Sequence, residues 1–233
     1  LIVTNGADEL ITLISSAYLD EGDEIIVLYP SFSECDFGAD LMGATIVPVK
    51  FDEGFQFNID KIIDALTEQT KLLYICSPNN PTGTYLPKEQ FEQLLNAVPD
   101  HVLVILDGAY SHYAEAEDYT DGLEFVKAGK NVLVMQTFSK VYGLAGLRVG
   151  YGIAPAHITQ TILKVKEPFN VNSLGQAAAA AAIHDDEHVL MSKKKNKEGA
   201  QMLYDAFEEL NLNYTETQSN FILVQLGPDA EQL

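Results

Sequence analysis

The sequence predicts an α/β fold in which a mostly parallel central sheet is flanked by helices. Seven apolar runs rich in Val, Ile and Leu predict the strands, at 1–4, 25–29, 45–49, 71–76, 102–107, 131–137 and 148–153. Amphipathic stretches such as DELITLISSAYLD (8–20) and PKEQFEQLLNAV (87–98) lie between them and predict helices. This alternation is typical of a sheet that is buried on both faces.

We expect three parts along the chain. A large α/β domain covers 1–172, a long helical connection covers 173–210, and a smaller C-terminal α/β domain begins in 211–233, where YTETQSNFILVQL predicts a strand. The first residues, LIVTNG, lack a methionine and already predict a strand. We therefore expect the chain to be an interior piece of a longer protein, truncated at both ends.

Composition excludes several classes of partner. The formal net charge of −20 would repel nucleic acid and anionic lipid, and no apolar run is long enough to span a bilayer. The strong acidity leaves open a salt-adapted source. The two cysteines are too few for a disulfide framework, which favours a cytoplasmic location. HDDEH (184–188) matches an inverted zinc-protease pattern, but no third ligand accompanies it, so we expect no metal.

Polar and small side chains follow the predicted strands, at the edge where such sheets bind ligands. Gly6 permits a tight turn after the first strand, so that the amides of Ala7 and Asp8 would open a helix suited to binding phosphate. Further candidates lie at or just after the ends of later strands, namely Asn80, Asp107, Tyr110, Thr137, Ser139 and Lys140. These residues predict one site at the sheet edge.

Arg148 is the single arginine among 233 residues. Its planar guanidinium can bind a phosphate through two parallel hydrogen bonds, whereas lysine offers only a point charge. We therefore expect Arg148 to bind an anion at the same site.

Three separated motifs resemble the class I and II aminotransferases, which are pyridoxal-phosphate enzymes of fold type I. They are SPNNPTG (77–83), TFSKVYGLAGLRVGYG (137–152) and KEPFNVNSLGQAAAAAA (166–182). Together they are most similar to the histidinol-phosphate aminotransferase branch. The resemblance implies transamination between histidinol phosphate, as the amino donor, and 2-oxoglutarate in histidine biosynthesis. It also implies a homodimer with shared sites and a cofactor-binding role for 1–172.

The resemblance implies a role for each matching residue. Lys140 would form a Schiff base with pyridoxal 5'-phosphate and carry the proton in transamination, and Asp107 would pair with the pyridinium nitrogen. Tyr110 and Asn80 would contact the ring oxygen, while Phe32 would stack on the ring. The phosphate would be bound by the amides of Ala7 and Asp8 and by Thr137, Ser139 and Arg148, and Gly6 would complete the cofactor-binding set. These roles make Lys140, Asp107 and Tyr110 the predicted catalytic residues.

Three alternatives stay open. An aromatic amino acid aminotransferase or an amino-acid-phosphate decarboxylase of the same fold would need the same cofactor residues. A regulatory domain that binds pyridoxal phosphate without turnover is the alternative outside the enzymes. The resemblance implies that carboxylate-binding arginines lie in a C-terminal domain, and the count of one arginine leaves none here for substrate.

Overall fold

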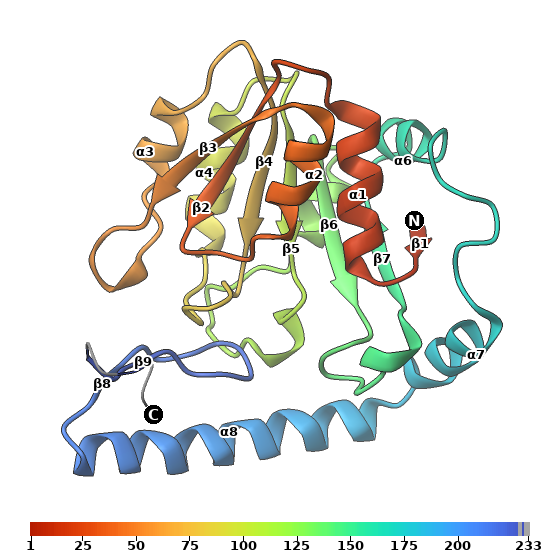
Figure 1. Ribbon diagram of the computed structural model, residues 1–233. Helices are drawn as coiled ribbons and strands as arrows, with labels where there is room; N and C mark the ends of the chain where they lie inside the picture. The colour runs from red at the N-terminus through yellow and green to blue at the C-terminus, as the bar shows by residue number, and fades with distance from the viewer. Residues whose placement is uncertain (228–229, 231–233) are drawn as a thin grey trace.

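The computed structural model describes residues 1–227 and residue 230. Within those residues, helices cover both faces of a central seven-stranded sheet (Figure 1). The strands of this sheet are β1 (Ile2–Thr4), β2 (Glu24–Tyr29), β3 (Thr45–Lys50), β4 (Thr70–Cys76), β5 (Leu103–Asp107), β6 (Val132–Thr137) and β7 (Gly150–Ile153). Each coincides with one of the apolar runs, so the predicted α/β class is confirmed.

The strands lie in the order β1-β7-β6-β5-β4-β2-β3. The five strands from β6 to β3 pair in parallel, whereas β7 runs antiparallel to both β6 and β1. Cys76 at the end of β4 lies opposite Asp107 at the end of β5. The carboxyl ends of the parallel strands, and the loops that follow them, therefore meet at one edge.

Two layers of helices bury the sheet. On one face lie α1 (Ala7–Tyr18), α2 (Glu34–Met42) and α6 (Ala156–Ile162), and on the other lie α3 (Ile59–Asp64), α4 (Lys88–Ala97) and α5 (Leu123–Lys127). Side chains along β4 alternate between the two cores, with Leu72 and Tyr74 in the first and Leu73 and Ile75 in the second. Burial on both faces explains why the strands are continuous apolar runs.

The C-terminal part differs in detail from the expectation. The predicted helical stretch is two helices, α7 (Ser173–Ala182) and α8 (Asp186–Glu209), because Asp185 caps a new helix by accepting a hydrogen bond from the His188 amide at 2.9 Å. Only short strands follow, β8 (Asn213–Tyr214) and β9 (Val224–Gln225), which pair antiparallel. Residues 215–223 between them are irregular. The predicted domain boundaries stay predictions, and 228–229 and 231–233 lie outside the described residues.

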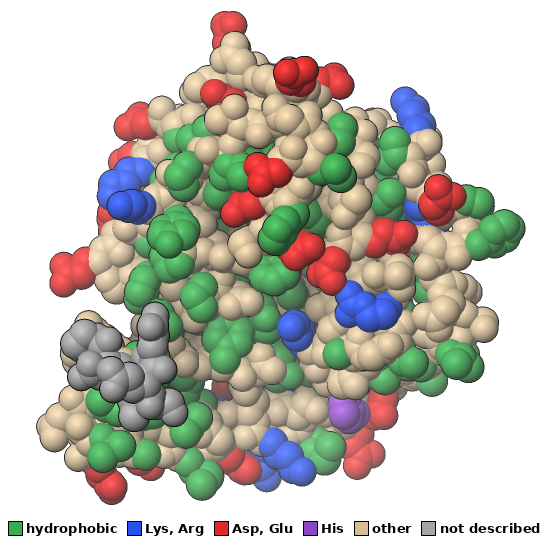
Figure 2. Space-filling view, in the orientation of Figure 1, with side chains coloured by type: hydrophobic (Ala, Val, Ile, Leu, Met, Phe, Trp, Pro, Cys, Tyr) green, Lys and Arg blue, Asp and Glu red, His purple; other side chains and the backbone are tan. Residues whose placement is uncertain are grey.

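Acidic side chains are spread over the face shown in Figure 2, with fewer Lys and Arg side chains between them, as the net charge of −20 requires. In the part of the chain that the structure describes, no helix combines the length and apolarity needed to cross a membrane. No group of three or more His, Cys, Asp or Glu side chains in that same part is arranged to hold a metal ion. The His188 imidazole instead contacts the Val141 carbonyl at 3.0 Å.

Candidate active site

A cavity of about 270 Å³ opens at the carboxyl edge of the sheet. Every site residue predicted from the sequence lines it except Gly6, which lies beside the Arg148 guanidinium. The lining residues are Ala7, Asp8, Phe32, Cys76, Asn80, Asp107, Ala109, Tyr110, Met135, Thr137, Ser139, Lys140, Ala145 and Arg148. Loops after β1, β2, β4, β5 and β6 and the turn before β7 thus converge on one space.

One end of the cavity is built to receive an anion. Gly6 adopts a φ of 84°, a conformation that favours glycine, and α1 begins directly after it, so the first amides of a 12-residue helix face this end. A side chain at Gly6 would collide with the Arg148 guanidinium, and a Cβ at Gly150 would lie 2.5 Å from the Ala7 nitrogen. Two glycines therefore let the backbone and the arginine approach closely.

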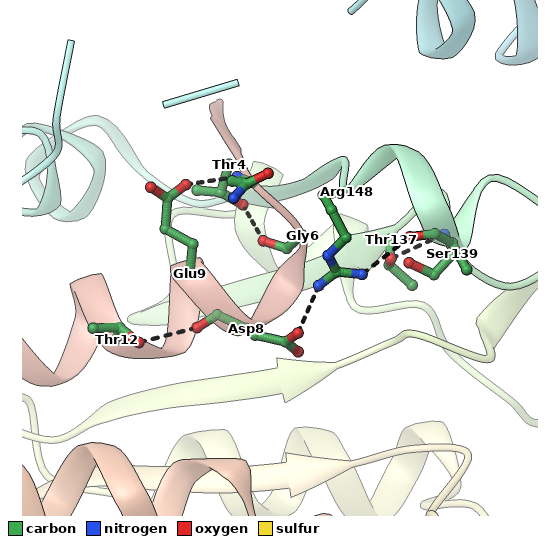
Figure 3. A network of polar contacts seen from close by, with 10 residues as sticks. Thr4, Gly6, Asp8, Glu9, Thr12, Thr137, Ser139 and Arg148 are labelled. Atoms are coloured by element: carbon green, nitrogen blue, oxygen red, sulfur yellow. Dashed lines mark hydrogen bonds and ion pairs between the residues drawn. The ribbon is translucent and has the colours of Figure 1, made fainter. Parts of the chain in front are cut away.

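Arg148 lies between the start of α1 and the loop after β6 (Figure 3). Its guanidinium donates to the Asp8 carboxylate at 2.6 Å and to the Ala145 carbonyl at 3.2 Å. Thr137 and Ser139 lie on the far side of the guanidinium from Asp8 in Figure 3, where the Thr137 hydroxyl accepts from the Ser139 amide at 3.0 Å. A guanidinium, two hydroxyls and a helix N-terminus together make a phosphate-sized set of donors.

Asp107 lies at the floor of the cavity and is only 8% exposed. Burial raises the pKa of its carboxyl to about 6, while a hydrogen bond from the Ala109 amide at 3.0 Å and the charge of Lys140 oppose that shift. A buried carboxylate with one oxygen bound to the backbone is suited to hold a proton shared with a ring nitrogen. Its neighbour Cys76 is also buried, which raises the pKa of that thiol.

Tyr110 and Lys140 face each other across the middle of the cavity. The Lys140 amine lies 5.2 Å from the centre of the Tyr110 ring, within range of a cation–π contact. The Asn80 amide donates to the Tyr110 hydroxyl at 3.5 Å, a long hydrogen bond. The amine, the phenol and the amide therefore lie close together in the cavity that Asp107 also lines.

Asn79, which sequence reasoning did not nominate, organises the loop that carries Asn80. It is fully buried, accepts from the Ser31 hydroxyl at 2.6 Å and donates to the Thr82 hydroxyl at 2.9 Å. Asn79 therefore ties the loop after β4 to the loop after β2. The asparagine doublet between two prolines was the available signal, but it does not say which asparagine points inward.

Four further lining residues were not nominated, namely Cys76, Ala109, Met135 and Ala145. Cys76 and Met135 belong to buried strands, and a continuous apolar strand does not reveal which residues point toward the site. Three larger cavities lie elsewhere: one of about 770 Å³ is lined mostly by apolar side chains, one of about 760 Å³ lies beside α8, and one of about 400 Å³ lies around Asn131. None of them gathers the lysine, carboxylate, phenol and guanidinium found in the 270 Å³ cavity.

Comparison with curated proteins shows close relatives along the whole chain. A histidinol-phosphate aminotransferase of Moorella thermoacetica is 45% identical over 234 residues, covering 100% of this chain and 60% of the relative. One from Bacillus licheniformis is 42% identical, with coverage of 100% and 64%. The chain thus spans about three fifths of the length of these relatives.

Solved structures share the fold. The histidinol-phosphate aminotransferase from Sinorhizobium meliloti in complex with pyridoxal-5'-phosphate superposes with a TM-score of 0.91 at 25% identity, covering 98% of this chain and 62% of that one. The aspartate aminotransferase from Thermus thermophilus with maleate gives 0.86 at 28% identity, with coverage of 97% and 62%.

The family model for aminotransferase class I and II matches residues 1–233, the entire chain. That match covers the strands, the cavity and the helices that follow them. The chain therefore belongs to the class I and II aminotransferase family.

Proposed function

We propose that this chain is the cofactor-binding part of a pyridoxal-phosphate-dependent aminotransferase that acts on histidinol phosphate and 2-oxoglutarate in histidine biosynthesis. The observation that carries the proposal is the convergence of Lys140, Asp107 and Arg148 on one cavity of about 270 Å³. The curated relatives named histidinol-phosphate aminotransferase, 36–45% identical to this chain, support the choice of substrate.

The residues of the cavity fit the cofactor at both ends. The amides at the start of α1, the hydroxyls of Thr137 and Ser139 and the Arg148 guanidinium suit a dianionic phosphate. At the other end, the buried Asp107 carboxylate suits a protonated ring nitrogen. Close approach at the phosphate end depends on Gly6 and Gly150, because a Cβ at either position would fill that space.

When bound, pyridoxal phosphate supplies an electron sink for charge that develops at the substrate carbon. Asp107 would keep a proton on the ring nitrogen, because a buried carboxylate attracts a neighbouring cation strongly. Asn80 and Tyr110 would hold the ring oxygen, and Phe32 would pack against the ring. Lys140 would provide the amine that binds the cofactor and would then accept and return the proton of the substrate.

The test is an amino-donor screen on the whole protein, comparing histidinol phosphate with phenylalanine, tyrosine and aspartate and measuring glutamate formed from 2-oxoglutarate. We expect histidinol phosphate to give the highest kcat/KM. Preference for phenylalanine or tyrosine would establish the aromatic aminotransferase instead. Carbon dioxide release in place of glutamate would establish a decarboxylase, and cofactor binding without any turnover would establish the regulatory domain.

Lys140 can be tested apart from substrate choice. Borohydride treatment of the cofactor-loaded protein should attach the cofactor to the peptide that contains Lys140, as measured by mass spectrometry. Lys166, which lies outside the cavity, serves as the internal control because its peptide should carry no label. Label on any peptide that lacks Lys140 would overturn the assignment.

We propose that the protein is a homodimer and that a second copy covers the apolar groove of about 770 Å³ formed by β1, β7, α7 and the loop before α7. Phe169 in that loop is 96% exposed, and Leu174 and Ile183 are also exposed. Exposed apolar surface of this extent is typical of an interface. Light scattering should give a dimer mass, and Phe169→Glu should shift the protein toward monomer.

We also propose a cytoplasmic location. Cys35 and Cys76 are both buried as free thiols, which suits a reducing compartment. Cell fractionation should recover the protein with cytoplasmic markers, and recovery from a membrane or an exported fraction would contradict the proposal.

A further inference from the structure

The segment 215–221 between β8 and β9, which we call the strap, contacts the loops around the cavity. The Gln218 amide donates to the Gly83 carbonyl at 2.9 Å. The Gln218 side-chain oxygen accepts from the amides of Glu115 and Ala116 at 2.7 and 3.1 Å, across more than 100 residues of sequence. One glutamine thus joins the strap to the loop after β4 and to the loop after β5.

The strap is also held from the side of α8. The Thr217 amide donates to the Tyr204 hydroxyl at 2.9 Å, and the Asn196 side chain donates to the Ser219 carbonyl at 2.9 Å. Ser219 is buried. In Figure 1 the strands β8 and β9 lie between α8 and the lower ends of the sheet strands. The strap therefore connects the long helix to the carboxyl edge of the sheet.

At its end the strap reaches a residue that lines the cavity. The Phe221 ring packs edge-on against Tyr110, with centroids 5.0 Å apart and planes at 90°. This is a favourable aromatic geometry. Within the site, Tyr110 also contacts Asn80, through a hydrogen bond of 3.5 Å, and Lys140, whose amine lies 5.2 Å from the ring centre. Because the Asn80 hydrogen bond is long, the Phe221 contact is an important constraint on the Tyr110 ring.

We propose that Gln218 and Phe221 are positioning residues of the active site. Gln218 fixes the strap on the two loops, and the fixed strap holds Phe221 against Tyr110. Neither side chain lines the cavity, so both act through Tyr110. Only the kinetic measurement of this inference rests on the proposed function. Cofactor binding and amide exchange test the contacts of Gln218 and Phe221 without requiring turnover.

The experiment compares four variants of the whole, cofactor-loaded protein. Gln218→Leu removes the acceptor of the two amides, whereas Gln218→Glu keeps an acceptor oxygen at the same place. Phe221→Leu removes the ring contact and leaves the hydrogen bonds of the strap intact. Glu216→Ala changes an exposed strap residue and is the matched control.

The first readout is hydrogen exchange in the peptide that contains Glu115 and Ala116. In Gln218→Leu we expect exchange about tenfold faster than in wild type, which corresponds to about 1.4 kcal/mol, the order of one hydrogen bond. Gln218→Glu and Glu216→Ala should exchange like wild type. Unchanged exchange in Gln218→Leu would overturn the anchoring role.

The second readout is the Kd for pyridoxal phosphate together with the kcat and KM of transamination. In both Gln218→Leu and Phe221→Leu we expect the Kd for pyridoxal phosphate to rise about threefold or more and kcat to fall about tenfold, with KM changing less than about twofold. Gln218→Glu should restore both values. If Phe221→Leu binds cofactor like wild type, or if Gln218→Glu fails as Gln218→Leu does, the proposal is wrong. Should the wild type lack transaminase activity, the proposed function fails, while cofactor affinity and exchange still decide this inference.

Discussion

The guanidinium of Arg148 donates to the carboxylate of Asp8 at 2.6 Å, joining the turn before β7 to the first turn of α1 across 140 residues of sequence. Both side chains are partly exposed, at 40% and 51%. An ion pair of that exposure contributes about 0–1 kcal/mol. A phosphate dianion can therefore draw Arg148 away from Asp8, but it then meets the negative charge of Asp8 at close range.

This relationship predicts opposite effects for two substitutions. Arg148→Lys should weaken pyridoxal phosphate binding about tenfold or more, because the paired hydrogen bonds of the guanidinium are lost. Asp8→Asn should tighten binding about twofold to threefold, because it removes a competing anion and leaves the Asp8 amide in place. Titration followed by cofactor absorbance measures both. Weaker binding in Asp8→Asn would mean that the carboxylate is needed to aim Arg148.

Asp107 predicts a pH dependence of stability in the cofactor-free protein. Its folded pKa of about 6 lies above the ordinary value of 3.8, so the folded state binds more protons than the unfolded state between these values. The contribution of this carboxyl to the free energy of unfolding is therefore present below about pH 4 and lost as pH rises through 6. Asp107→Asn should remove this loss.

The measurement is the difference in unfolding free energy between Asp107→Asn and wild type, followed by urea titration from pH 4 to pH 8. The difference should grow in favour of the variant by about 3 kcal/mol and then level off above pH 6. Asp64→Asn, the same substitution at an exposed position on α3, is the matched control. A flat line for Asp107→Asn would contradict the raised pKa.

Gly150 predicts a steric effect on the phosphate end of the cavity. A Cβ there would lie 2.5 Å from the Ala7 nitrogen and 2.6 Å from the Gly6 carbonyl carbon, both backbone atoms. Gly150→Ala should therefore destabilise the protein by about 1–3 kcal/mol and weaken cofactor binding. Gly146→Ala is the control, because open space surrounds that position. Thermal melts with and without cofactor would measure the loss of stability and of cofactor binding. Equal melting temperatures for Gly150→Ala and Gly146→Ala would contradict the prediction.

Buried thiols predict slow chemical modification. Cys35 and Cys76 are both buried, and burial raises the pKa of each thiol, so little reactive thiolate forms. A thiol reagent should label neither cysteine in the native protein at pH 8 and both after denaturation. Rapid native labelling of one cysteine would show that its surroundings open readily.

Much of the fold follows from the sequence because the strands are buried on both faces. A strand such as β5 needs apolar residues at successive positions, and that pattern is visible without knowing its neighbours. The break between α7 and α8 was missed, although Asp185 carries a capping signal, because the alanine-rich stretch before it and the charged stretch after it both favour helix. The antiparallel reversal of β7 has no local signature either.

The candidate site was also only partly predictable from the sequence. Asp107, Thr137 and Lys140 were predictable as lining residues since they lie at or just after strand ends, which meet at one edge of the sheet. The Arg148–Asp8 pair and the contact of Phe221 with Tyr110 were not predicted, because each depends on two segments more than 100 residues apart. Asn79 is more buried than Asn80 because it accepts a hydrogen bond from Ser31 in the loop after β2. The SPNNPTG motif does not include that loop, so the motif alone could not predict which asparagine is buried.

The pairing of β1 with β7 has a consequence for synthesis of the chain. Residues 6–8 leave the ribosome about 140 residues before Arg148, a delay on the order of ten seconds at ordinary rates of protein synthesis. Until β7 inserts between β6 and β1, the two halves of the phosphate end have not met. Nascent chains shorter than about 150 residues should therefore be unable to retain the cofactor, and its capture marks the moment at which the last strand of the sheet is in place.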